Sequence, residues 1–334
     1  MSNSIRKPSE LIINPKIKML IYGQSGIGKT TLALSVSKNP LLFDFDEGVN
    51  RVDFRILGDT ATVQVENYQD FLDVLDKEDL TPYDALVFDT GGKMLDFMAD
   101  FIMKSDYKLK NKNGMLTLQG YGVRKGAFSA ICKRINTMGK DVVFVAHRET
   151  VTEDEQTRFI PQFGGSNYDA LVRELDVVGY MEANGRIRTI TFDPTSRNDG
   201  KNTCNLPSVI NIPELFNEQG EKVRENVFLR EKVIDTYINR LNQRKQSSEA
   251  FNILMDNIQK EIDLITDAKS ANMFLANIES FEHKETSLLL SKQKLMQKAK
   301  SLSLEFDKET SAFIIAKAKK DEQVFFLSIN IRYL

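Results

Sequence analysis

One stretch near the N-terminus combines glycines, a lysine and a threonine at the spacing of a phosphate-binding loop. Residues 23–30 read GQSGIGKT and fit the pattern G-x-x-x-x-G-K-[ST]. Glycines let backbone N–H groups close around phosphate oxygens, and the start of a following helix adds partial positive charge. Lys29 can reach the β- and γ-phosphates, and the Thr30 hydroxyl can hold Mg²⁺. The residues expected to bind the nucleotide are Gly23, Gln24, Ser25, Gly26, Ile27, Gly28, Lys29, Thr30 and Thr31.

Acidic residues follow two apolar runs further along the chain. Asp46 and Glu47 come directly after residues 41–45, and Asp89 ends the run at 85–89. Short apolar runs predict buried strands, and ligands of open α/β sheets bind at the carboxyl ends of the strands. A carboxylate ending such a run is the Walker-B pattern, so we expect Asp89 to bind Mg²⁺ directly or through water, opposite Thr30.

A histidine occupies the corresponding place after a third run. Residues 141–146 read DVVFVA, a strongly apolar run that predicts a central strand, and His147 follows it. A lone histidine is more often structural than catalytic. Its expected place at the same sheet edge as the acids favours a functional role here.

The local elements around the loop come in the order that a phosphate site requires. Residues 17–22 predict a buried strand before it, and residues 31–38 predict a helix after it that ends before Pro40. This context argues against an ordinary glycine turn. Residues 54–57 predict a short further strand, and Asn67 is typical of a helix N-cap. The Asn184–Gly185 pair between two β-prone runs predicts a hairpin.

Two polar segments remain open to alternative interpretations. Residues 104–114 carry four lysines and Tyr107, which suits a nucleic-acid contact, although the sequence slightly favours a solvated surface loop. Arg197 and Lys201 lie in the polar segment 193–202. They could reach a γ-phosphate, within one chain or across a subunit interface, or they could belong to a surface turn.

Composition sets the broad class of the protein. A chain of 334 residues with a formal net charge of −2 gives no global case for nucleic acid and has room for one large α/β domain and an appendage. Two cysteines without metal-type spacing indicate reduced thiols in a cytoplasmic protein. We expect no membrane segment. The expected organisation is an N-terminal arm at 1–15, an ATPase domain at 16–213 and a mainly helical C-terminal region at 214–334.

Together these features resemble the RecA-like P-loop ATPases. The sequence looks closest to phage-encoded ATP-binding proteins of an AAA-type family that includes RecA-like single-strand annealing proteins. The resemblance covers about Lys16 to Pro213. It rests on the P-loop, on the acids after residue 44, on Asp89, on the run ending at His147, and on residues 163–167 (FGGSN), which resemble the segment closing a DNA-binding loop in RecA-like proteins.

The resemblance implies an α/β fold with a mainly parallel central sheet, in which the strand at 141–146 lies between the P-loop and Walker-B strands. It implies ATP as the nucleotide, a water-polarising carboxylate at Asp46 or Glu47, and a sensor at His147. Lys29 would stabilise the developing charge. It also implies DNA-binding loops at about 104–122 and 148–167. The acidic run at 153–155 and the C-terminal helices depart from the family pattern.

The resulting expectation is an ATPase that couples ATP and Mg²⁺ to single-stranded DNA binding in phage recombination or replication. Single-strand binding protein, replication proteins and further copies of the chain are candidate partners. The main alternative is an ATPase that acts on a protein partner, as a loader or packaging accessory. A small-molecule kinase would need an arginine-bearing lid, and a GTPase would need an aspartate that reads guanine; neither feature is present in the sequence.

Overall fold

The computed structural model describes residues 15–153, 156–164 and 166–316. Residues 1–14 of the predicted arm and the apolar stretch at 324–331 therefore lie outside the described part. The described residues divide between two compact units, one ending at Leu241 and the other beginning at Asn242. Within the described ranges, no helix is long and apolar enough to cross a membrane.

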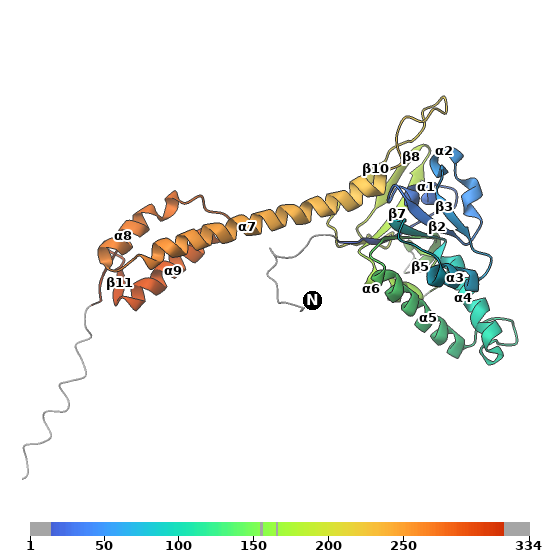
Figure 1. Ribbon diagram of the computed structural model, residues 1–334, viewed down its shortest axis with the longest axis horizontal. Helices are drawn as coiled ribbons and strands as arrows, with labels where there is room; N and C mark the ends of the chain where they lie inside the picture. The colour runs from blue at the N-terminus through green and yellow to red at the C-terminus, as the bar shows by residue number, and fades with distance from the viewer. Residues whose placement is uncertain (1–14, 154–155, 165, 317–334) are drawn as a thin grey trace, which may run out of the picture. The chain divides into compact units, whose positions relative to one another are not determined.

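A mainly parallel sheet forms the centre of the first unit (Figure 1). Its main path has the order β10-β8-β7-β1-β5-β4-β2-β3, and the six strands from β7 to β3 are parallel. The central strand β5 lies between the P-loop strand β1 and the Asp89 strand β4, as predicted. The parallel strands are β1 (Lys18–Gly23), β2 (Pro40–Asp44), β3 (Ala61–Gln64), β4 (Ala85–Asp89), β5 (Asp141–Glu153) and β7 (Val177–Asn184). The predicted RecA-like α/β fold class is confirmed.

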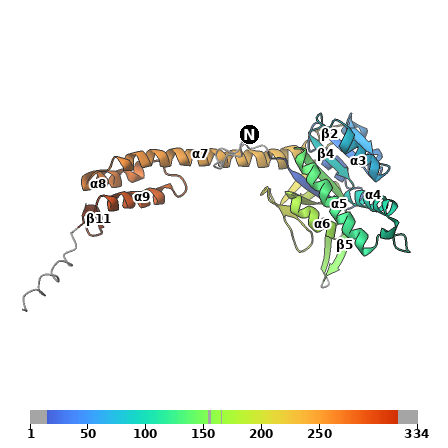
Figure 2. The same ribbon diagram turned by 60° about the horizontal axis from the view of Figure 1, so that its bottom comes forward.

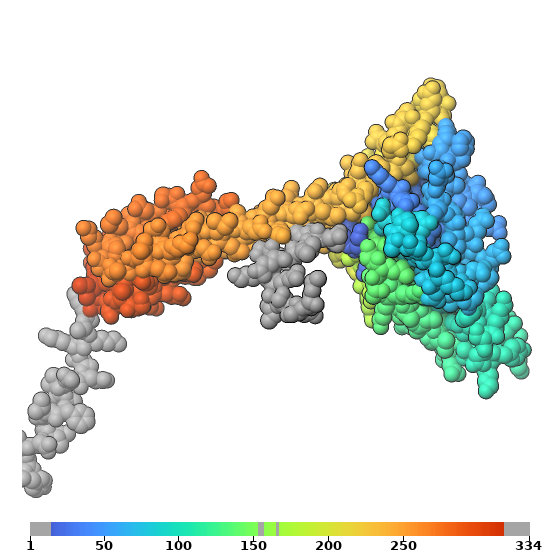
Figure 3. Space-filling model, viewed as in Figure 1, coloured from blue at the N-terminus to red at the C-terminus, as the bar shows by residue number. Residues whose placement is uncertain are grey.

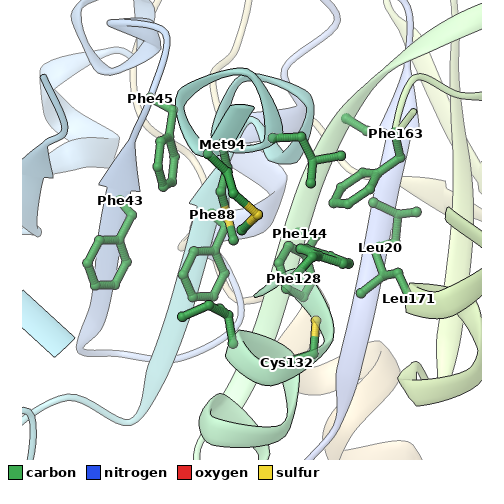
Figure 4. Packing of buried hydrophobic residues seen from close by; sticks show 14 of the residues in the cluster. Leu20, Phe43, Phe45, Phe88, Met94, Phe128, Cys132, Phe144, Phe163 and Leu171 are labelled. Carbon is green, nitrogen blue, oxygen red and sulfur yellow. The ribbon is translucent and has the colours of Figure 1, made fainter. Parts of the chain in front are cut away.

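Alternate residues of these strands face two separate cores. On one face Phe43, Phe88 and Phe144 stack across β2, β4 and β5, with ring centroids 5.2 and 4.9 Å apart (Figure 4). On the other face Val87 and Val143 pack among the residues of α1. Because both faces are covered, the strands are apolar throughout, which explains why the sequence marked them so clearly.

Helices cover the aromatic face of the sheet. α4 packs on α5 and α5 on α6, and Figure 2 shows the three together. Asn67 caps α3 by accepting the N–H groups of Gln69 and Asp70, as predicted. The helices are α1 (Lys29–Leu34), α2 (Phe54–Leu57), α3 (Tyr68–Lys77), α4 (Gly91–Ser105), α5 (Leu118–Thr137) and α6 (Ser166–Glu174). Two 3₁₀ turns, η2 (Gly48–Arg51) and η3 (Tyr107–Leu109), connect them.

Three local predictions require correction. The segment 54–57 is helix α2 and not a strand, because the Asp53 carboxylate accepts the N–H of Arg55 and caps a helical turn. α1 ends at Leu34, earlier than predicted, and the Ser35 hydroxyl donates to the carbonyl of Leu32. The sequence at 123–138 also predicts a helix, and the helix found there, α5, begins earlier, at Leu118, because Thr117 caps it.

The segment 148–167, which the resemblance assigns to a DNA-binding loop, is largely ordered structure. β5 continues past His147 and pairs with β6 (Gln156–Pro161) as an antiparallel hairpin, and α6 follows. Thr150, Val151 and Phe159 favour strands, and this preference outweighed the loop signals from Pro161 and the following glycines. The second possible DNA segment is thus a hairpin in its described residues.

The far edge of the sheet is antiparallel. β8 (Ile187–Thr191) returns from β7 across the predicted turn at Asn184–Gly185, and Gly185 has a φ of 59°. β10 (Val209–Ile212) extends this edge and β9 (Lys201–Asn202) pairs with β7. A π-helical turn, η4 (Arg230–Asp235), follows later in the chain. Four apolar residues in this turn and just before it are buried in the core of this unit: Phe228, Leu229, Val233 and Ile234. The first unit therefore extends past the predicted boundary at 213.

The second unit is mainly helical, with a core of its own. It contains most of α7 (Thr236–Asp263), then α8 (Ala268–Asn277), the 3₁₀ turn η5 (Ile278–Ser280) and α9 (Ser287–Ser301). A small hairpin of β11 (Leu304–Asp307) and β12 (Ala312–Ile315) closes it. Ile258, Ile262, Phe274 and Leu295 are among its buried residues.

Candidate nucleotide-binding site

Backbone geometry explains why the loop after β1 needs its glycines. Gly28 caps α1 with a φ of 92°, a conformation that L side chains rarely adopt. A Cβ at Gly23 would lie 2.4 Å from the carbonyl oxygen of Met181 on the neighbouring strand β7. The glycines therefore set both the curvature of the loop and its close packing against the sheet.

Lys29 lies at the floor of a cavity of about 190 Å³ beside this loop, hereafter the phosphate cavity. Its side chain is 6% exposed and its ammonium donates to the carbonyl of Gln24 at 2.8 Å. Burial lowers the pKa of Lys29, while the nearby carboxylates of Asp89 and Asp46 act to raise it. Of the residues expected in the loop, those that line the cavity are Ser25, Gly26, Gly28, Lys29, Thr30 and Thr31. Gly23, Gln24 and Ile27 do not line it.

Thr30 and Asp89 meet at one wall of the phosphate cavity. The Thr30 hydroxyl donates to Asp89 Oδ2 at 2.5 Å. Burial raises the Asp89 pKa to about 6, while the hydrogen bond from Thr30 acts in the opposite direction. A hydroxyl and a carboxylate in contact are hard oxygen ligands of the kind that Mg²⁺ takes beside substrate phosphates, so these two residues fit the expected metal. Among the described residues, no cluster of three or more His, Cys, Asp or Glu side chains offers a separate metal site.

The acid that ends β2, Asp44, and the two that follow it, Asp46 and Glu47, have different environments. Asp44 is buried and accepts the backbone N–H groups of Gly48 and Val49 at 2.9 and 3.0 Å, which shapes the turn. Glu47 is exposed, has a φ of 57° and does not line the cavity. Asp46 lines it, and its Oδ1 is buried without a hydrogen-bond partner. Of the two acids that the sequence left open, only Asp46 faces the place where phosphate would lie.

His147 completes the same wall. Its Nε2 lies 3.9 Å from Asp46 Oδ2, and its ring lines the phosphate cavity. His147 and then Arg51, whose Nη2 is 3.5 Å from Asp46 Oδ2, hold the pKa of Asp46 below its usual value. The backbone carbonyl of His147 accepts the N–H of Gln162 at the base of the β5–β6 hairpin. One residue thus contacts both the phosphate cavity and the hairpin.

Two cations proposed from the sequence lie elsewhere. Lys201 donates to the carbonyl of Val172 at 2.7 Å, and Arg197 lies 3.5 Å from Glu182 with its guanidinium over the ring of Phe159. Neither lines the phosphate cavity. In this structure both side chains are engaged away from the phosphate cavity.

Two arginines near the loop carried no sequence signal. Arg51, on η2, lines the phosphate cavity. Arg188, on β8, donates from Nε to the carbonyl of Ile27 at 3.1 Å. A lone arginine outside a motif has no distinctive spacing, and Arg188 is 161 residues away from the loop that it contacts. Only the strand order places it there.

A larger cavity of about 710 Å³ adjoins the phosphate cavity and shares Gly28 and Thr31 with it.

The connection between α4 and α5 is a separate feature, which protrudes from the first unit (Figure 3). Here Lys104, Lys108, Lys110 and Lys112 are all exposed, and Tyr107 is 80% exposed. We call residues 104–118 the basic tip.

Comparison with known proteins places this geometry in context. A family model described as an AAA domain matches residues 15–204, which is more than half of the chain. Among curated proteins no match was found. Matching solved structures include a KaiC-like protein from the archaeon Pyrococcus horikoshii OT3, at 12% identity and a TM-score of 0.32, covering 54% of this chain and 79% of that one. The ATPase domain of G40P matches at 11% identity and a TM-score of 0.37, with coverages of 63% and 84%.

Proposed function

This chain belongs to the AAA domain family and is a P-loop ATPase, and from that premise we propose that it couples ATP hydrolysis to binding of single-stranded DNA. The process would be phage recombination or replication. The observation that carries the hydrolytic part is that Lys29, the Thr30–Asp89 pair and Asp46 all line one small cavity.

The roles of the phosphate-cavity residues follow from their chemistry. Backbone N–H groups of the loop and the Lys29 ammonium bind the β- and γ-phosphates. Thr30 and Asp89 would hold Mg²⁺, which would neutralise charge on the phosphates. The ionised Asp46 carboxylate accepts a hydrogen bond from the attacking water and orients it. As negative charge develops on the transferred oxygens, the Lys29 ammonium stabilises it.

His147 is suited to pass the state of the phosphate cavity to the rest of the unit. Its ring faces Asp46, and its carbonyl holds Gln162 at the base of the hairpin. A change in the Asp46 environment on hydrolysis would therefore reach the β5–β6 hairpin through one residue. This link is the proposed coupling between nucleotide and DNA.

The basic tip is the proposed DNA contact. Exposed lysines can neutralise phosphates, and the exposed ring of Tyr107 offers a surface on which a base can stack. In its described part, the β5–β6 hairpin carries Glu149 as well as Arg148, so its charge favours DNA less. The tip is therefore the first place to test.

The test is ATP turnover and binding of a labelled single-stranded oligonucleotide, at low and moderate salt. In the variant Lys108→Gln/Lys110→Gln/Lys112→Gln we expect weaker binding and a smaller dependence on salt. The control Lys38→Gln/Lys77→Gln/Lys133→Gln removes the same charge from exposed lysines outside the tip. Equal binding by both variants would contradict the assignment of the tip.

A second candidate function is an ATPase that acts on a protein partner. The observation that favours it is the separate core of the second unit, around Ile258, Phe274 and Leu295. Truncation after Leu241, where the two units divide, should then leave ATP turnover intact and abolish partner binding. DNA-independent turnover by the full chain would favour this candidate over DNA coupling.

A further inference from the structure

The larger cavity has the size and lining of a site for a small organic ligand. Its volume of about 710 Å³ is within the usual range for such pockets, which are mostly apolar with a few polar groups. Its apolar walls include Leu32, Ile56, Met181, Ile212, Leu215 and Phe228. Charged residues, among them Arg186, Glu214 and Arg224, also line the cavity, and together with the apolar walls they suit a ring system that carries polar groups.

The junction with the phosphate cavity restricts what this ligand can be. Gly28 and Thr31 line both cavities, so a molecule bound at Lys29 can continue directly into the larger one. At the junction Arg188 is fixed by its bond to the Ile27 carbonyl, and it lies against Gly28. An anionic group followed by such a ring system matches this sequence of surfaces.

We propose that the larger cavity holds the nucleoside half of the nucleoside triphosphate, with Arg188 beside the phosphate nearest the ribose. The proposal rests on the proposed function, since it assumes that the phosphate cavity holds the triphosphate. It assigns recognition of the nucleoside largely to the segment 212–232, which lies beyond the residues matched by the AAA domain family.

Side-chain contacts hold this segment against the loop and α2. The Asn226 amide donates to the carbonyl of Thr31 at 2.7 Å. The Arg55 guanidinium lies 4.1 Å from the centre of the Phe216 ring and also donates to the carbonyl of Gly220. Arg55 does not line the cavity, so it is a positioning residue: it sets where Phe216 stands in the wall.

The first experiment compares ATP with inorganic tripolyphosphate, both with Mg²⁺, on two tryptophan variants of α2. Ile56 lines the cavity and Phe54, two residues away, is 79% exposed and does not. Ile56→Trp should fill part of the cavity and weaken ATP binding by about tenfold or more, while tripolyphosphate binding stays within about twofold. Phe54→Trp should change neither affinity.

A second variant keeps the proposal testable if Ile56→Trp does not fold. The chain has no tryptophan, so Phe216→Trp introduces a single fluorescent reporter in the cavity wall. Its emission should change on addition of ATP and stay constant with tripolyphosphate, whereas Phe54→Trp should respond to neither ligand.

The outcomes separate the two proposals. Three results would overturn the nucleoside site. In Ile56→Trp, ATP and tripolyphosphate affinity could fall equally, or ATP affinity could stay unchanged. In Phe216→Trp, the emission could stay constant although ATP is bound. Failure of the unmodified chain to bind either ligand would instead overturn the proposed function.

Discussion

The phosphate cavity and the larger cavity beside it share two residues and differ in almost everything else. Charged side chains define the first: Lys29, Asp46 and Asp89 all line it, and two of the three are buried. The second combines apolar side chains, which come from α1, α2, β7, β10 and the segment that follows, with charged ones such as Glu214 and Arg224. One cavity is small and built around a motif, and the other is large and assembled from distant segments.

This difference follows from the cost of burying charge. A buried ammonium or carboxylate is stable only with partners at fixed places, so few residue types can occupy such a site. Apolar walls tolerate many substitutions of similar volume. A phosphate site therefore leaves a recognisable pattern in a sequence, and a nucleoside wall leaves almost none.

The largest expected effect is at Lys29. In Lys29→Ala we expect ATP turnover to fall by about 10²- to 10³-fold, because the transition-state charge loses its buried cation. ATP and tripolyphosphate binding should weaken together, in contrast to Ile56→Trp. The exposed Lys38→Ala is the control. If Lys29→Ala weakened ATP binding and left tripolyphosphate binding unchanged, the assignment of the phosphates to the phosphate cavity would be wrong.

The next effect distinguishes two adjacent acids. Asp46→Asn keeps the shape of a side chain that lines the cavity but cannot hold the attacking water as a carboxylate does. We expect turnover to fall by about 10²-fold with ATP binding nearly unchanged. Glu47→Gln is the matched control and should stay within about threefold in the same assay. The reverse ranking of the two variants would transfer the water-orienting role to Glu47.

Asp89 should show that function and stability conflict in the phosphate cavity. Its folded pKa of about 6 is above the ordinary value of 3.8, so the charged form is destabilised by folding. This penalty is absent below pH 3.8 and grows as the pH rises towards 6. Without nucleotide and Mg²⁺, Asp89→Asn should therefore raise the free energy of unfolding at pH 7.5 by roughly 1 to 3 kcal/mol.

Urea unfolding at several pH values measures this effect. The gain from Asp89→Asn should shrink as the pH falls from about 6 to 4, and the variant should not hydrolyse ATP. A variant that is less stable than the unmodified chain at pH 7.5 would show that Asp89 is not under strain from its burial. No comparable pH effect is expected from the apolar walls of the larger cavity.

The smallest effect concerns the contact that joins the two cavities. Asn226→Ala removes the bond to the Thr31 carbonyl, and we expect a loss of about 1 kcal/mol in stability and a few-fold loss in ATP affinity. Tripolyphosphate affinity should not change. Asn136→Ala removes an exposed amide–carboxylate hydrogen bond between α5 and Glu174 of α6 and is the control. If Asn226→Ala and Asn136→Ala changed ATP affinity equally, Asn226 would have no specific role in ATP binding.

The fold was predictable where burial imposes a pattern. The runs at 41–45, 85–89 and 141–146 are apolar throughout because their strands are covered on both faces, and the loop between β1 and α1 follows from its glycines. Short segments were less certain. Four residues at 54–57 can form a strand or a helical turn, and the cap from Asp53 decided in favour of the turn.

The site was predictable only in part, for the same reason. Sequence spacing alone could not choose between Asp46 and Glu47, because adjacent residues share every positional signal. The left-handed backbone at Glu47 and the bonds from Asp44 to the turn separate them. Arg51 and Arg188 reach the loop only through tertiary structure, and the walls around Phe216 consist of residue types that are common everywhere.

The continuity of β5 limits how the hairpin can move. The strand runs unbroken from Asp141 to Glu153, with Phe144 in one core and Val143 and Val145 in the other. Sliding by one residue would exchange these faces. The end of the hairpin could therefore move only if the strand tilted, like a lever, about the segment in the core. From His147 to Glu153 the lever arm is roughly 20 Å, at about 3.3 Å per residue, so a tilt of about 5° would displace its end by nearly 2 Å. A small rotation beside the phosphates would thus become a larger movement at the tip of the hairpin.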